Sequence, residues 1–342
     1  MDIALFGMGA CTAVGHDLAS TAAAVRAGIS GFAEHRFAMD SLGEPIRVAA
    51  APWLESTLKT EQRLEILLFT AIDEALGEMR RKGVRLALSV GLPEPRPGLP
   101  SLAAWSQQIV GARFKDVFTG AAFAERGHAA ALIALQAAQA SILAGDCDAC
   151  VVAGVDSWVN PVTLAWLEST HQLHGVGRYN NAWGFVPGEA GAALLIARVD
   201  LAETLHTKPL ARLLRTSSGE EKNCIKTPTV CTGVGLTAVM REVLAARPGG
   251  ARVSDLYSDM NGEPYRADEF GFAIARTSQS FVHASAVVTP ADCTGDVGAA
   301  SGALHLALAA TAVRKRYASG SLALTYAGSE GGARAAALIG FD

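Results

Sequence analysis

The chain has 342 residues, of which 50% are hydrophobic and 18% are charged, and its formal net charge is -4 at pH 7. A chain of this length and composition can bury a large core, which excludes a disordered protein and is compatible with two domains or one duplicated domain. The Lys and Arg residues are scattered and the pI is near 6.1, which argues against nucleic acid as a partner.

The N-terminal residues and the cysteines indicate the cellular compartment of the protein. No Lys or Arg precedes the first apolar run, unlike in a secretory signal. No run reaches the roughly 18 uninterrupted apolar residues of a membrane span, so we expect a soluble, cytoplasmic protein without membrane contact. Cys147 and Cys150 have the spacing of a metal or redox pair, but they lead into an apolar run, and we predict that they are core thiols.

Hydrophobic periodicity predicts alternating strands and helices. A helix starting at Ala129 follows a turn that contains His128, and a buried strand comes after it. In chain order we predict a strand at 2–10, helices at 16–31 and 60–83, a strand at 85–93, the helix from 129, strands at 150–156, 192–199 and 210–219, and a helix at 236–250. This alternation is typical of an α/β protein with covered sheets.

Two segments of the chain resemble each other. CVVAGVD (150–156) and LTYAGSE (324–330) are both apolar strands that end in Ala-Gly, one further residue and an acid, and each follows an Ala-rich helix entered through glycines. This echo predicts two related halves, residues 1–204 and 205–342. The alternative is that any two helix-strand units of small residues look alike.

Several motifs together resemble the β-ketoacyl-acyl-carrier-protein synthases of the thiolase superfamily. The opening segment ALFGMGACTAVGHDLASTAAAVRAGISGF is similar to their first strand, loop and helix. WGFVPGEAGAALLI (183–196) is similar to their Gly-Phe-Val-x-Gly-Glu-Gly-Ala signature. DLYSDMNGEPYRADE (255–269) and TGDVGAASGALHLAL (294–308) fall where the family has two histidine motifs. The resemblance implies a five-layer αβαβα sandwich built from two pseudo-symmetric halves, usually as a homodimer.

The resemblance also assigns positions to the family's catalytic groups. His128 falls at the nucleophilic cysteine, Asn261 and Asp296 at the two imidazoles, and Ala291 at the lysine. Acyl transfer needs a thiolate at a helix N-terminus and neutral donors that face the developing oxyanion. A carboxylate at 296 would repel that oxyanion and remove a stabilisation of roughly 3 to 4 kcal/mol. We therefore expect no condensation activity.

Three further positions count against recognition of an acyl carrier protein. Glu263 and Tyr265 align with threonines that hold pantetheine, and Glu330 aligns with a gating aromatic. We expect a polar pocket lined by His128, Asn261, Asp296 and Glu330, in which His128 is hydrogen-bonded and Asn261 and Asp296 satisfy each other or nearby backbone groups.

The remaining candidates have structural explanations. Gly188 and Glu189 are predicted to form a tight turn before the strand at 192–199. His171 and His174 lie three apart but lack further ligands, so we predict no metal there. Cys293 aligns near the pocket, which leaves a relocated thiol as an alternative. No cofactor is expected.

Two hypotheses for function follow. The first is an inactive ketosynthase-like protein that acts through protein–protein interaction, either as the partner of an active synthase or as an accessory factor to a type VI secretion effector module. The second is an acyltransferase or hydrolase of altered chemistry that acts on acyl thioesters with His128 oriented by Asp296. An open tunnel with these two side chains within hydrogen-bond reach would favour the enzyme, and a filled tunnel would favour the binding protein.

Overall fold

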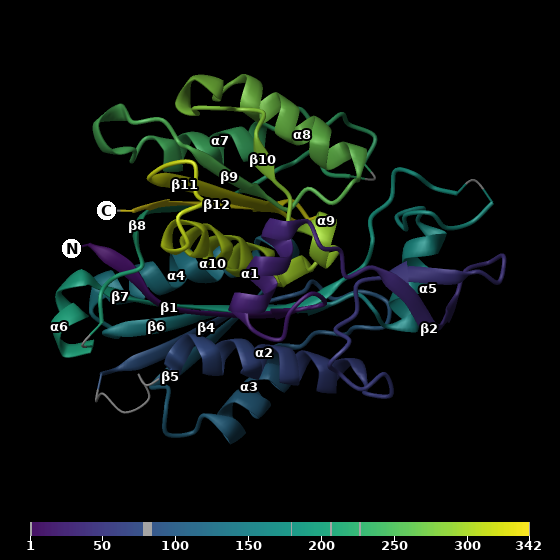
Figure 1. Ribbon diagram of the computed structural model, residues 1–342, viewed down its shortest axis with the longest axis horizontal. Helices are drawn as coiled ribbons and strands as arrows, with labels where there is room; N and C mark the ends of the chain where they lie inside the picture. Colours follow the sequence, from purple (N-terminus) through teal and green to yellow (C-terminus); the bar gives the residue numbers. More distant parts are fainter. Residues whose placement is uncertain (1, 78–83, 179, 206, 226, 342) are drawn as a thin grey trace.

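The computed structural model describes residues 2–77, 84–178, 180–205, 207–225 and 227–341. Its ten main strands form one continuous sheet that bends into two packed halves, with helices outside and between them (Figure 1). The layers are therefore helix, sheet, helix, sheet and helix, as the sequence predicts.

Each half of the sheet contains five strands. The first half runs in the order β5-β4-β6-β7-β1, and the second in the order β10-β9-β11-β12-β8. Within each half the strands that are first, second, third, fourth and fifth along the chain therefore occupy the same places. The halves join where Ile3–Leu5 pairs antiparallel with Ala211–Leu213. The strands are β1 (Ile3–Thr12), β4 (Leu86–Leu92), β5 (Gly120–Glu125), β6 (Ala149–Ser157), β7 (Glu189–Arg198), β8 (Ala211–Glu220), β9 (Asp255–Ser258), β10 (Val287–Val288), β11 (Leu322–Gly328) and β12 (Ala333–Gly340).

The helices divide among three layers. The outer layers contain α2 (Thr60–Leu76) and α3 (Ala103–Arg113) on the first half, and α7 (Val234–Leu244) and α8 (Pro264–Ala275) on the second. The central layer contains α4 (Ala130–Ala144) and α10 (Ser301–Arg314), which contact strands of both halves. The other elements are α1 (Leu18–Ala27), α5 (Pro161–Ser169), α6 (Ala202–Leu205), α9 (Ala291–Thr294) and a separate hairpin of β2 (Ala33–Met39) and β3 (Pro45–Val48).

The small residues of the central helices explain why two sheets can close on them. A Cβ on Gly91 of β4 would lie 2.4 Å from the backbone nitrogen of Ala131, and one on Gly302 would lie 2.5 Å from Cγ of Leu132. Helices that are apolar on all sides belong in the interior. The helical run 127–144 is long and apolar enough to cross a membrane, but more than half of it is buried inside this fold, as expected of a core helix.

The predicted elements are confirmed where they can be compared. The two similar strands, β6 and β11, are each the fourth main strand of their half along the chain and the middle strand of that half of the sheet. Residues 78–83 of the predicted helix 60–83 lie outside the described residues. Cys147 and Cys150 are buried, and burial raises the pKa of both thiols. The division at 204/205 stays a prediction.

Candidate functional site

His128 lies in the turn that leads into the central helix α4. Strand β5 ends at Glu125, and a single 3-10 turn, Gly127–Ala129, connects it to Ala130. Gly127 has φ of +57°, a conformation that L side chains rarely adopt, so glycine suits the sharp change of direction. The prediction that His128 lies at or just before a helix N-terminus is confirmed, and its side chain is buried.

Asp296 is held in place by backbone hydrogen bonds to residues 186–188 of the other half. Its N–H donates to the Val186 carbonyl, and its carbonyl accepts from the Gly188 N–H, each over 2.8 Å. A Cβ on Gly188 would lie 2.4 Å from the Thr294 carbonyl oxygen, so only glycine permits this approach. The predicted tight turn at Gly188 and Glu189 is therefore wrong, because Gly188 forms a β-bridge with Ala49 and Glu189 begins β7. Glu189 is structural, as a buried ion-pair partner of Arg63.

The three sequence-predicted site residues meet at the Asp296 carboxylate. His128 Nε2 lies 2.8 Å from Oδ1 and 2.9 Å from Oδ2, and the Asn261 amide donates to Oδ2 over 2.6 Å. The Gly298 N–H donates to Oδ1 over 2.8 Å. Asp296 therefore accepts from three groups, which is the hydrogen bonding that a buried carboxylate needs.

Arg266, which the sequence analysis did not single out, completes this cluster. Its Nη1 donates to Oδ2 of Asp259 over 2.9 Å and to the Gly328 carbonyl over 2.8 Å. Its Nη2 lies 3.2 Å from Nε2 and 3.4 Å from Nδ1 of His128. The side chain is buried, so a guanidinium fills the space beside the imidazole.

The charges of the cluster bias its protonation states. Burial alone would raise the pKa of Asp296, but His128 and Arg266 hold it well below its usual range. Burial would lower the pKa of His128, but the Asp296 carboxylate outweighs both burial and Arg266 and leaves this pKa raised. Burial raises the pKa of Glu263, despite the nearby Arg266. A charged Asp296 therefore lies beside a histidine whose raised pKa biases it toward its protonated form.

A small cavity of about 200 Å³ lies against His128. Two of the four expected lining residues, His128 and Glu330, line it, whereas Asn261 and Asp296 do not, because they are behind the imidazole and bonded to each other. Its other walls include Glu94, Arg96, Trp158 and Trp166. The Arg96 guanidinium is over the Trp158 ring at 3.6 Å and pairs with the buried Asp156.

Glu263 and Glu330 are linked by one amide. The Gln172 side-chain nitrogen donates to Glu263 over 3.1 Å and also to Glu330. The Tyr265 hydroxyl is buried and has no hydrogen-bond partner among the described residues. Ala291 begins α9, and Cys293 on the same helix contacts the Val25 carbonyl at 4.0 Å instead of lining the cavity. The alternative of a relocated thiol is therefore not supported.

Possible metal ligands gather elsewhere. In the part of the chain that the structure describes, Glu221, Cys231 and Glu269 form the one group of three such side chains, and His171 and His174 are not in it. Glu221 accepts from the N–H of Gly235 near the start of α7, and Glu269 pairs with Arg334. Helix capping and ion pairing account for both carboxylates.

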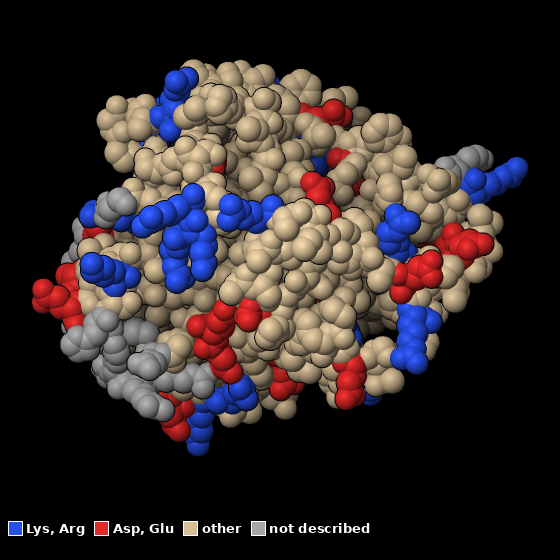
Figure 2. Space-filling model, viewed as in Figure 1, with Lys and Arg blue, Asp and Glu red and all other residues tan. Residues whose placement is uncertain are grey.

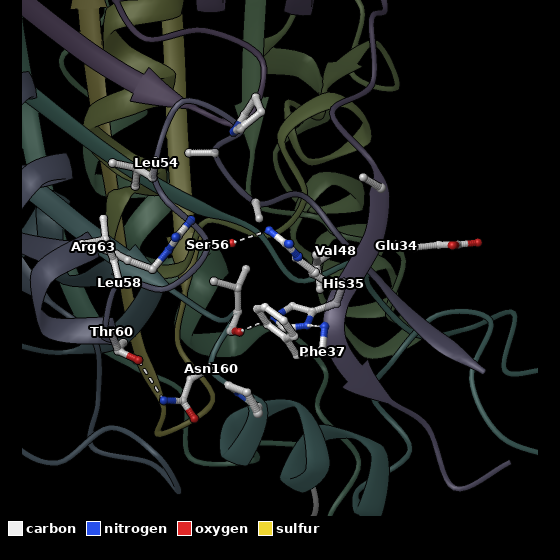
Figure 3. A pocket seen from close by; sticks show the side chains of 17 residues that line it. Glu34, His35, Phe37, Val48, Leu54, Ser56, Leu58, Thr60, Arg63 and Asn160 are labelled. Atoms are coloured by element: carbon white, nitrogen blue, oxygen red, sulfur yellow. Dashed lines mark hydrogen bonds between the residues drawn. The ribbon is translucent and has the colours of Figure 1, made fainter. Parts of the chain in front are cut away.

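A second hollow of about 310 Å³ lies under the β2–β3 hairpin (Figure 3). Its polar groups bond to one another across the opening: Arg36 donates to Ser56, and Asn160 donates to Thr60. The His35 ring is used at both nitrogens, by the Val159 carbonyl and by the N–H groups of residues 37 and 38. Because these polar groups already have hydrogen-bond partners within the protein, the surface that this hollow offers to a ligand is mainly apolar.

Comparison with known proteins agrees with the geometry. Residues 121–202 match the β-ketoacyl synthase N-terminal domain. The fold superposes on the oxazolomycin ketosynthase domain OzmH KS7 of Streptomyces albus JA3453, with TM-score 0.80 and 16% identity, covering 100% of this chain and 76% of that one. The fold also superposes on the AntDE:AntF complex, a type II PKS acyl-carrier protein with its ketosynthase. The TM-score is 0.83 and the sequence identity 14%, and the match covers 100% of this chain and 99% of that one.

A third similar structure is the ishigamide ketosynthase/chain length factor, with TM-score 0.73 and 20% identity, covering 100% of this chain and 99% of that one. A search of curated protein sequences found no match. The family model covers only residues 121–202, and the likeness to these solved structures shows that the whole chain has the ketosynthase fold.

In this fold the positions that the resemblance assigns to catalytic groups converge. His128, Asn261 and Asp296 come from three distant segments and form one hydrogen-bonded cluster. Ala291, at the lysine position, has a side chain that carries no charge. The cluster supplies one buried imidazole with a carboxylate on it, and Arg266 is against the same ring.

Proposed function

We propose that the protein is a non-condensing ketosynthase-like subunit that acts by binding other proteins. The single observation that carries this proposal is the position of the His128 ring between Asp296 and Arg266. Nε2 lies within hydrogen-bond distance of the Asp296 carboxylate, and the Arg266 guanidinium lies 3.2 Å from Nε2 and 3.4 Å from Nδ1, so both ring nitrogens are next to charged side chains. An imidazole held in this way is neither a free nucleophile nor a free base.

The surroundings of His128 also oppose a developing oxyanion. The pKa of Asp296 is held low, so a negative charge lies next to the position where acyl transfer would build another one. Arg266 carries a compensating charge, but two of its hydrogen bonds are used by Asp259 and the Gly328 carbonyl. These contacts support a structural role for the whole cluster.

The proposed partner is a protein. Similar structures include a ketosynthase/chain length factor and a ketosynthase in complex with an acyl-carrier protein. We infer that this chain works in the cytoplasm as an accessory or adaptor-type subunit, with an active synthase or a type VI secretion effector module as the candidate partners. It pairs with itself or with its partner at the β5 edge, because β5 is a terminal strand of the main sheet.

The test is a condensation assay with malonyl and acyl thioesters. We expect no product from the wild type, and none from His128→Cys, because Asp296, Asn261 and Arg266 still surround the new thiol. An active ketosynthase assayed in parallel shows that the substrates are competent. Condensation by the wild type would refute the proposal.

The second candidate function is hydrolysis of acyl thioesters. One observation favours it: His128 and Asp296 lie within hydrogen-bond distance, as a base and its orienting carboxylate do. If it holds, wild type releases free thiol from acyl thioesters and His128→Gln does not. If both release it at the uncatalysed rate, this candidate is excluded.

A further inference from the structure

A groove between α1 and the end of α10 lies apart from the residues around His128. Its volume is about 490 Å³, and its walls include four alanines of α1 together with Thr311 and Tyr317. The alanines are Ala19, Ala22, Ala23 and Ala27. Because these side chains are small and apolar, the backbone of a bound protein segment can approach α1 closely in this groove.

Basic side chains surround this groove. Arg26 and Lys315 line it, and Arg314 and Arg316 are next to Lys315 on the same exposed turn. Figure 2 shows Lys and Arg side chains gathered on this face over α1 and the end of α10, without acidic side chains among them. Within the described residues none of the four forms an ion pair, and Arg26 instead lies over the Tyr317 ring at 4.4 Å. The expectation that basic residues are merely scattered is therefore wrong for this face.

Helix dipoles explain only part of this charge. Arg26 and Arg314 lie in the last turns of α1 and α10, where a cation is favourable. Lys315 and Arg316 lie beyond α10, so the helix dipole does not explain them. With Arg26 and Arg314 they give this face a local charge of +4, although the net charge of the chain is -4.

Arg316 adopts a backbone conformation that favours glycine. Its φ is +60°, and it follows Lys315, the C-cap of α10, at the position where helices commonly end in glycine. A glycine there would be less strained, so the arginine is explained better by its charge than by the turn.

We propose that this groove binds an acidic amphipathic helix of a protein partner. Carboxylates on such a helix would meet the four cations, and its small or apolar face would pack on the alanines. The ten residues of α1 span about 15 Å, which fits roughly three turns of a partner helix. This inference rests on the proposed protein-binding function and names the chemistry of its partner.

Other occupants fit the surface less well. The four cations suit phosphates, but the alanine floor offers no hydrogen bonds to sugars or bases, which disfavours nucleic acid. A membrane contact needs protruding apolar side chains to insert, and the groove is recessed between two helices.

The test is fluorescence anisotropy at low salt with a labelled, alanine-based helical peptide of about 14 residues that carries glutamates along one face. We expect binding by wild type, and a loss of about tenfold or more in Arg26→Glu/Lys315→Glu. Arg241→Glu, an exposed charge reversal on α7, is the matched control and should bind within about twofold of wild type. A peptide of the same composition with two added prolines should bind weakly.

Arg316→Gly separates binding from folding. We expect it to weaken peptide binding while its Tm equals or exceeds that of wild type, because glycine relieves the positive φ. The proposal is overturned if the helical peptide does not bind, if the reversed and control variants bind it equally, or if a DNA duplex or phosphatidylglycerol vesicles compete it off more strongly than unlabelled peptide does. Condensation by the wild type would refute the proposed function and leave this groove untouched.

Discussion

The resemblance places His128 at the position of a catalytic nucleophile, but both nitrogens of its ring contact buried charged side chains. The ring contacts a carboxylate and a guanidinium, both buried, and Asn261 links the same carboxylate to Glu263. Removing one partner from a buried ion pair generally costs more than the pair contributes, since the remaining charge is left unpaired. The cluster is therefore expected to resist single substitutions that would rebuild a catalytic site.

The residue-scale prediction concerns pH. Because the folded pKa of His128 is raised, its contribution to stability is fully present below about pH 6.5 and is lost as pH rises through the folded pKa. Because the pKa of Asp296 is lowered, its contribution is present above about pH 4 and lost on acidification. The unfolding free energy of wild type relative to His128→Gln should thus shrink between pH 6 and 9, by about 1.4 kcal/mol for each pH unit that separates the two His128 pKa values.

Urea denaturation at several pH values measures this difference. His283→Gln, which replaces an exposed histidine, controls for the loss of a titratable group. A stabilisation that grows toward pH 9 would contradict the pairing of His128 with Asp296.

The sequence predicts part of this site and misses the rest for a physical reason. The motifs around His128, Asn261 and Asp296 bring these residues together by resemblance alone. Arg266 is five residues beyond Asn261 in the same motif, but its burial depends on acceptors at Asp259 and Gly328, and no local pattern indicates that those acceptors converge.

At the scale of elements, the close approach of strands and helices determines the fold. Apolar runs predicted the buried strands and the amphipathic helices because burial imposes their periodicity. The β2–β3 hairpin, α5 and α8 were not predicted. Strand β2 has the sequence AEHRFAM and is mostly exposed, so it has no apolar alternation. Helix α8 begins at Pro264, inside the segment 255–269 that was interpreted as a family motif and not as a helix.

The element-scale prediction tests the packing of β4 on α4. Gly91→Ala would place a methyl group 2.4 and 2.5 Å from backbone atoms of residues 131 and 130, which must shift. We expect it to lower the unfolding free energy by about 1–3 kcal/mol in a denaturant titration.

Gly271→Ala is the matched control. Nothing lies within 4 Å of a Cβ at this α8 position, so alanine should raise stability by about 0.5–1 kcal/mol through helix propensity. Equal stabilities of the two variants would mean that the sheet and the central helix are not as close as described.

At the scale of the whole molecule, two equivalent halves share one continuous sheet, and β5 is an end strand of it. Half of β5 is exposed, including Ala121. An exposed edge strand is a ready surface for pairing with a second copy. The family resemblance implies a homodimer, but the sequence alone does not show that β5 is an end strand, since strand order is a property of the assembled sheet.

We expect a homodimer formed through β5. Light scattering at micromolar concentration should give twice the 35.5 kDa chain mass, and Ala121→Lys should give the monomer mass with an unchanged circular dichroism spectrum, because an edge charge opposes pairing. A wild-type monomer, or an Ala121→Lys dimer, would count against pairing at this strand.

We propose that the buried cluster around His128 does no acyl chemistry, and intact-protein mass spectrometry can test this proposal on the wild type. The wild type is incubated with acetyl and malonyl thioesters beside an active ketosynthase that becomes acylated. We expect an unchanged mass and no thiol release above background. An acyl adduct that maps to the peptide containing His128, formed at a stoichiometry close to one, would contradict it.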